Sequence, residues 1–173
     1  MNHIGPMIAD SARLSVGYAK RLLEGVAAAD FSKFARVGGQ VIQSNHPAFV
    51  LGHLSLYPAR IVSELGHDAS AIVPSDRETE LFAPTAVCVD DPEGAIYPRM
   101  DVIFPRFLER YEAVMEILQT ADDSQFIVEN PNERMREKFA TMGSMHAFYL
   151  GGHTMIHLGQ LSAWRRAMGM PAA

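Results

Sequence analysis

The chain has 173 residues, of which 48% are hydrophobic and 20% charged, and its formal net charge is −5. This length and apolar content fit one globular domain with its own core and exclude general disorder. A single cysteine, Cys88, excludes a disulfide framework and a cysteine-based zinc cluster, while the acidic balance argues against a nucleic-acid-binding surface. If the protein binds a metal ion, its seven histidines must supply most of the ligands.

No segment of the sequence predicts secretion or insertion into a membrane. The first residues lack the basic start and the apolar stretch of a signal peptide. The longest apolar runs are far shorter than the roughly 18 residues that cross a bilayer. We therefore expect a soluble, cytoplasmic protein with no membrane partner and no nucleic-acid partner.

Helical periodicity predicts two long helices in the first part of the chain. The first covers residues 7–29, with apolar side chains at four-residue steps from Leu14 onward. The second begins at Pro47, whose missing N–H would have no partner in a first turn, and ends at Gly66. Pro58 should kink this helix, because it removes one backbone hydrogen bond and its ring crowds the preceding turn.

The second half of the chain predicts a loop and two more long helices. Residues 67–97 contain three prolines and no helical period, which is typical of a loop and long for a compact domain. A third helix follows Pro98, and a short helix lies near residues 133–139. The last long helix covers residues 141–168.

These elements predict one domain over residues 1–173. Apart from a weak alternation at residues 87–89, no segment predicts a strand. The expected architecture is therefore an all-α four-helix bundle, antiparallel where the loops are short. The long loop between the second and third helices would cover a pocket and help to select the substrate.

Two histidines of the last helix carry the strongest chemical signal. His153 and His157 are four residues apart, which puts both rings on one helix face about one turn apart. Their apolar neighbours indicate an interior face, where a shared metal ion would compensate the cost of burying two imidazoles. His53, in the second helix, is able to supply a third ligand from a facing helix. We expect a divalent ion here (Zn, Ni, Fe or Mn) and leave its identity open.

Glycines precede the candidate ligands in both helices, as Gly52 and as Gly151 and Gly152. A glycine inside a helix costs about 1 kcal/mol relative to alanine, so it usually has a packing reason. These glycines either let two backbones approach closely around a metal site or make room for bulky core neighbours. The sequence leaves both interpretations open.

Two motifs resemble those of a known superfamily. The sequence HTMIHLGQL at residues 153–161, with the residues that follow it, resembles the C-terminal helix of the DinB/YfiT-like superfamily. The sequence NHPAFVLGHL at residues 45–54 resembles its second-helix motif. Tyr97-Pro98, at the start of the third predicted helix, fits as well. The motifs occur in the expected order along nearly the whole chain.

The resemblance implies a fold, a metal site and several reactions. It implies a four-helix bundle, often a homodimer, that holds a divalent metal with His53, His153 and His157. The superfamily includes metal-dependent S-transferases that use low-molecular-weight thiols, a mycothiol-dependent isomerase, and members described only as metal-dependent hydrolases. Thr154 departs from many relatives, in which an acidic residue follows the first histidine of the pair, so one group able to handle protons is missing here.

Three functional hypotheses follow from these observations. Three histidine ligands leave a coordination position open, as in catalytic sites, where a metal ion lowers the pKa of a thiol or a water molecule. Activation of a low-molecular-weight thiol for S-transfer to a small-molecule substrate comes first, because hydrolysis usually also needs a general base. Metal-dependent hydrolysis comes second. The third hypothesis is a non-catalytic, metal-binding bundle associated with stress.

Other polar residues have mainly structural interpretations. His146 lies on the same helix face as His153 but about 13 Å from the metal level, so it either lines the pocket or is a buried, hydrogen-bonded histidine. Gln160 either fixes a ligand ring or caps a neighbouring helix. His46 opens the second helix, and Arg165 is expected to be solvated near a helix end. Two further histidines are expected at the surface, His3 and His67.

Overall fold

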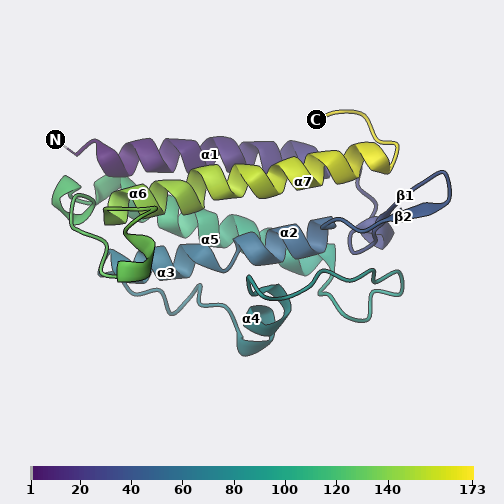
Figure 1. Cartoon of the computed structure of the whole chain (residues 1–173), viewed down its shortest axis with the longest axis horizontal. Coiled ribbons are helices and arrows are strands. Elements are labelled where there is room, and N and C mark those ends of the chain that lie inside the picture. The colour runs from purple at the N-terminus through teal and green to yellow at the C-terminus, as the bar shows by residue number, and fades with distance from the viewer. Residues whose placement is uncertain (1) are drawn as a thin grey trace.

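The chain folds into helices that lie side by side, with one small sheet at the end of the molecule (Figure 1). The computed structural model describes residues 2–173. The α-helices are α1 (Ile4–Leu23), α2 (Pro47–Leu54), α3 (Tyr57–Glu64), α4 (Asp76–Phe82), α5 (Met100–Thr120), α6 (Met142–Ala147) and α7 (His153–Ala167), and the strands are β1 (Ala35–Val37) and β2 (Gln40–Ile42).

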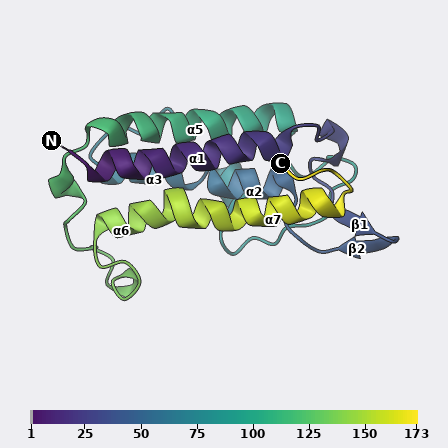
Figure 2. The same ribbon diagram turned by 90° about the horizontal axis from the view of Figure 1, so that it is seen from above.

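The core lies between the long helices. Helix α1 contacts α5 and α7, α2 and α3 contact α5, and α2 also contacts α7. Figure 2 shows α1 running between α5 and α7 when the molecule is seen from above. The third predicted helix is confirmed as α5, and its Phe107, Tyr111 and Leu118 side chains are fully buried. The four-residue stripe of the first helix is confirmed only in part: Leu22 is fully buried, whereas Leu14 is 77% exposed and small residues such as Ala12 face the core there.

The second predicted helix is broken rather than kinked. Helix α2 ends at Leu54 and α3 begins at Tyr57, so that Pro58 lies in the first turn of α3, where no backbone N–H is required. The predicted end is confirmed, because Gly66 adopts a positive φ of 81° just after α3. The break places the end of α2 and the start of α3 beside α7.

The loop predicted at residues 67–97 contains a helix, α4, so the prediction of a structureless segment was wrong there. Ser75 caps α4 through a capping box with Glu78, a signature that is visible in the sequence. Glu78 also forms ion pairs with Arg110 (3.1 Å) and Arg106 (3.0 Å) of α5. These contacts tie the segment to the body of the protein, and α4 packs against α2.

Two short strands form a hairpin that the sequence analysis did not predict. Strands β1 and β2 pair antiparallel, with Ala35 opposite Ile42, and Gly38 and Gly39 form the turn with φ angles of 57° and 81°. The weak alternation at residues 87–89 belongs to no strand. The short helix expected near residues 133–139 is reduced to a single 3-10 turn at Glu133–Met135.

The last predicted helix is divided into α6, a π-helical segment at Phe148–Gly152 (η4) and α7. Near its end, Arg165 is buried, not solvated as expected. Its guanidinium donates to the carbonyl oxygens of Leu22 and Glu24, at the end of α1, and of Pro171. This side chain therefore holds two helix ends together. Within residues 2–173, no helix combines the length and the apolar character needed to cross a membrane.

Candidate metal centre

The three predicted ligands converge at one point between α2 and α7. The Nε2 atom of His153 lies 3.4 Å from Nε2 of His53 and 3.2 Å from Nε2 of His157. One nitrogen from each of the three side chains lies within 4.8 Å of the others, near enough to hold one metal ion. The four-residue repeat aligns His153 with His157, and the packing of α2 on α7 brings His53 to them.

Hydrogen bonds to the other ring nitrogen orient two of the three imidazoles. Nδ1 of His53 donates to the backbone carbonyl of Phe82 (2.8 Å), and Nδ1 of His157 donates to Oε1 of Gln160 (3.0 Å). Carbonyl oxygens only accept, so each Nδ1 carries the proton and each Nε2 keeps its lone pair. Such outer partners fix the tautomer and direction of metal-binding histidines. The first interpretation of Gln160 is thereby confirmed.

His153 completes the group without a partner of its own. Its Nδ1 atom is buried and has no hydrogen-bond partner within residues 2–173. Its Nε2 faces two unprotonated nitrogens and can donate a proton to only one of them. The three side chains therefore direct more lone pairs than protons at one point. A divalent cation fits this arrangement, because neutral imidazole nitrogen is a good ligand for such ions.

Burial keeps all three imidazoles in the form that binds metals. Loss of hydration lowers the pKa of His53 and of His157 below the usual value for histidine. The pKa of His153 falls to about 4, because burial is reinforced by the neighbouring His157 and His53. The rings are consequently neutral at pH 7, and no proton must be removed before a cation binds.

Tyr57, which the sequence analysis did not single out, belongs to the same group. Its hydroxyl lies 3.2 Å from Nε2 of His53, and its ring stacks on Tyr149 with centroids 4.7 Å apart. Burial and the adjacent Tyr149 raise the pKa of Tyr57 to about 12, so its hydroxyl keeps its proton and donates to His53. The four-residue spacing from His53 was the available signal, because the continuous helix predicted from Pro47 to Gly66 would put both residues on one face.

The glycines next to the ligands serve different contacts. A Cβ atom on Gly52 would lie 2.4 Å from the ring of Phe82, the residue whose carbonyl orients His53. A Cβ atom on Gly151 would lie 2.6 Å from Oγ of Ser11. At Gly152 the nearest atom would be at 3.4 Å, an ordinary contact. Room for a bulky neighbour is therefore the reason for glycine at position 52.

The histidines open onto a pocket of about 330 Å³. Asn45 and Phe49 line it from the first turn of α2 and the residues before it, and Pro84 and Ala86 line it from the segment after α4. The loop region expected to cover a pocket thus forms one of its walls. A second pocket of about 610 Å³ adjoins it, since Asn45 and Ala86 line both. Together they can hold a molecule larger than the histidine pocket alone.

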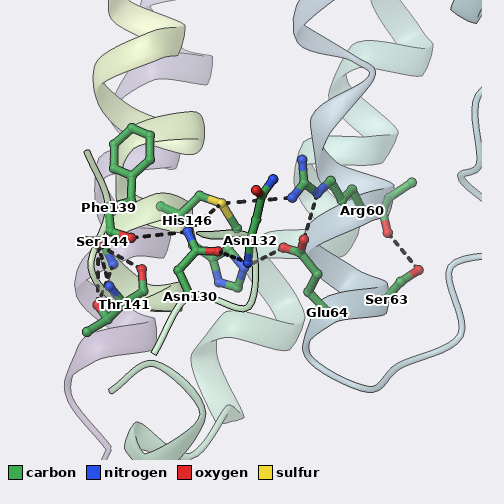
Figure 3. A network of polar contacts seen from close by, with 11 residues as sticks. Arg60, Ser63, Glu64, Asn130, Asn132, Phe139, Thr141, Ser144 and His146 are labelled. Carbon is green, nitrogen blue, oxygen red and sulfur yellow. Dashed lines mark hydrogen bonds and ion pairs between the residues drawn. The ribbon is translucent and has the colours of Figure 1, made fainter. Parts of the chain in front are cut away.

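His146 does not line this pocket. It belongs instead to a network of polar contacts with Glu64 and Arg60, which Figure 3 shows. It is fully buried, and its Nε2 lies 2.9 Å from Oε2 of Glu64. The other carboxylate oxygen of Glu64, Oε1, accepts a hydrogen bond from Nε of Arg60 (2.7 Å). Burial alone would raise the pKa of Glu64, but the hydrogen bonds from His146 and Arg60 outweigh it and lower that pKa. The π-helical segment changes the helix phase before His153, so the seven-residue spacing no longer puts both histidines on one face.

The remaining sequence candidates also have structural roles. Thr154 is buried; its hydroxyl donates to the carbonyl of Tyr149 and accepts from the hydroxyl of Tyr111, both at 2.9 Å. His46 caps α2, as expected, because its Nδ1 accepts from the backbone N–H of Phe49. The two histidines predicted at the surface are exposed, His3 and His67.

Comparisons of this chain with protein-family models, with curated proteins and with solved structures found no match. The resemblance to the DinB/YfiT-like superfamily therefore stays a prediction.

Proposed function

We propose that this chain is a metal-dependent enzyme of the DinB/YfiT type that activates a low-molecular-weight thiol for S-transfer. The observation that carries the proposal is the convergence of three neutral imidazole nitrogens at the wall of a pocket. A divalent ion held by three histidines keeps a position open and lowers the pKa of a thiol placed there. In the transfer, sulfur bonds to an electrophilic carbon, the leaving group departs with its electron pair, and the thiol proton goes to solvent.

The side chains around the pocket favour S-transfer over hydrolysis. Within residues 2–173, no aspartate or glutamate lines the pocket that holds the histidines. Hydrolysis usually needs a general base to take a proton from water, whereas a thiol activated by a metal needs only to lose its own proton. Thr154 cannot serve as that base, because its hydroxyl is buried and already paired.

The donor set also bears on the metal and on the assembly in this proposal. Three imidazoles without a carboxylate suit Zn²⁺, Ni²⁺ or Fe²⁺ better than Mn²⁺, which prefers oxygen ligands. The proposal includes the four-helix bundle and the homodimer implied by the resemblance. The four members of that bundle would be α1, the pair α2 and α3, α5, and the pair α6 and α7.

Metal content and turnover test the proposal directly. Apoprotein is incubated with each candidate metal in turn and desalted, and the bound metal is measured for wild type, His153→Ala and His67→Ala. We expect about one ion per chain in wild type and in His67→Ala, which loses an exposed histidine, and none in His153→Ala. Wild type that retains no metal would refute the metal centre.

The reaction is then assigned with a chromogenic haloarene and a panel of small thiols. We expect release of halide only with metal-loaded protein and a thiol. Turnover of esters or amides without any thiol would instead identify a hydrolase. Bound metal with neither activity would identify the non-catalytic bundle.

A further inference from the structure

The Tyr57 hydroxyl is placed at the edge of the histidine group and faces the pocket. It lies 3.2 Å from Nε2 of His53, and Tyr57 lines the same pocket as the three histidines. The ring is held on two sides: it stacks on Tyr149 and meets His153 edge-on, each at a centroid distance of 4.7 Å. The position of the hydroxyl is therefore set by packing as well as by its hydrogen bond.

This hydrogen bond competes with metal binding. In the neutral His53 ring the proton is on Nδ1, which donates to the carbonyl of Phe82, so Nε2 has a single lone pair. A cation bound to Nε2 takes that lone pair and leaves the Tyr57 hydroxyl without an acceptor on the ring. A tyrosine hydroxyl keeps its proton at neutral pH and needs another partner when it is partly buried.

Few other side chains around this pocket are free to donate a hydrogen bond. One N–H of the Asn45 side-chain amide donates to Gln160 (2.9 Å) and its second N–H remains, whereas the other lining residues apart from Tyr57 and the histidines, namely Phe49, Ala83, Pro84 and Ala86, carry no side-chain donor. Asn45 and Tyr57 are thus the two side-chain donors at this pocket, and the Tyr57 hydroxyl is the one that lies against a candidate metal-binding nitrogen, 3.2 Å from Nε2 of His53.

We propose that Tyr57 donates a hydrogen bond to the small molecule that binds next to the three histidines, and so selects molecules with an anionic sulfur or oxygen atom there. The inference rests on the metal centre of the proposed function. It assigns Tyr57 a role in ligand binding and none in holding the ion.

The test compares Tyr57→Phe with Tyr149→Phe in protein loaded with Co²⁺. Both substitutions remove one hydroxyl and keep the ring, and within residues 2–173 the Tyr149 hydroxyl makes no hydrogen bond to another side chain or to the backbone. Co²⁺ affinity is measured by titration of apoprotein. The affinity for 2-mercaptoethanol is measured from the change that the thiol causes in the visible spectrum of the cobalt protein.

We expect both variants to bind Co²⁺ within threefold of wild type. Thiol affinity should fall about tenfold in Tyr57→Phe, the usual size of one hydrogen bond to a ligand, and stay within twofold in Tyr149→Phe. Unchanged thiol affinity in Tyr57→Phe would overturn the inference and leave the metal centre intact. Loss of Co²⁺ binding in Tyr57→Phe alone would also overturn it, because Tyr57 would then hold the ion or the fold. Wild type that binds no Co²⁺ would refute the proposed function itself.

Discussion

At the residue scale, single hydrogen bonds decide which nitrogen each imidazole turns toward the centre. Oε1 of Gln160 accepts from Nδ1 of His157 and also from Nδ2 of Asn45, just before α2. One amide therefore fixes a candidate ligand on α7 and links it to the start of the helix that carries His53. Both hydrogen bonds are made by the side-chain oxygen of Gln160.

Replacing Gln160 by alanine should weaken metal binding without unfolding the protein. The His157 ring would lose the partner that fixes its tautomer and direction, which typically lowers metal affinity by about ten- to a hundredfold. The affinity is measured by competition with a chelator of known affinity, and the helical content by circular dichroism. Gln119→Ala, at an exposed position of α5, is the matched control and should behave as wild type. Equal affinities in the two variants would show that Gln160 does not support the centre.

At the element scale, several side chains of the candidate site and its surroundings lie where helices are interrupted or where two helices pack closely. Tyr57 contacts His53 across the break between α2 and α3, and the π-helical segment Phe148–Gly152 separates the face of His146 from that of His153. The close packing of α4 on α2 delivers the carbonyl of Phe82 to His53. Each of these features adjusts the position of one group in the site.

Gly52→Ala tests the contact between α2 and α4. The added methyl group would lie 2.4 Å from the Phe82 ring, so the ring or the helix must move. We expect the free energy of unfolding of the apoprotein to fall by about 1–3 kcal/mol, as for overpacked cores, together with a loss of metal affinity. Urea denaturation measures the first effect.

Gly159→Ala is the control for this substitution. Its methyl group meets nothing within 4 Å on the exposed side of α7, so the change should raise stability by about 0.5–1 kcal/mol through helix propensity. A Gly52→Ala protein as stable as wild type would mean that α4 can shift at little cost in free energy and does not position His53.

At the scale of the whole molecule, buried neutral histidines make stability depend on pH. Burial lowers the pKa of His46 to about 4 and that of His153 to about 4, whereas an unfolded chain has ordinary histidine values near 6.5. Below pH 6.5 the unfolded chain binds protons that the folded protein does not, so the free energy of unfolding falls as the pH falls. Full stability is therefore present above pH 6.5.

Urea denaturation of apoprotein between pH 7.5 and 4 should show this decline. His46 alone accounts for about 3 kcal/mol of lost stability by pH 4, because each pKa unit corresponds to about 1.4 kcal/mol. His46→Gln should flatten the profile while α2 keeps a capping side chain. A flat wild-type profile would contradict the lowered pKa values.

The sequence predicted which three histidines come together better than it predicted the residues around them. The spacing of His153 and His157 is a property of one helix, and the motif around His53 supplied the third residue. The position of Tyr57 beside His53 was predictable from their four-residue spacing, whereas the partner of His53 is the backbone carbonyl of Phe82, which no side-chain type indicates. The Ser75-x-x-Glu78 capping box, a signature of a helix start, was present in the sequence, but residues 67–97 were predicted as a loop from their prolines and their lack of helical period.

The distance along the chain between the candidate ligands determines which helices a bound ion would hold together. His53 and His153 are 100 residues apart in the sequence, yet their ring nitrogens lie 3.4 Å apart. An ion bound to both would act as a cross-link that closes a loop of 100 residues. A protein with one cysteine cannot form such a cross-link as an intramolecular disulfide. Stripping the ion should then make the amides of α2 and α7 exchange with deuterium sooner than those of α5, so that the two ends of this loop come apart first.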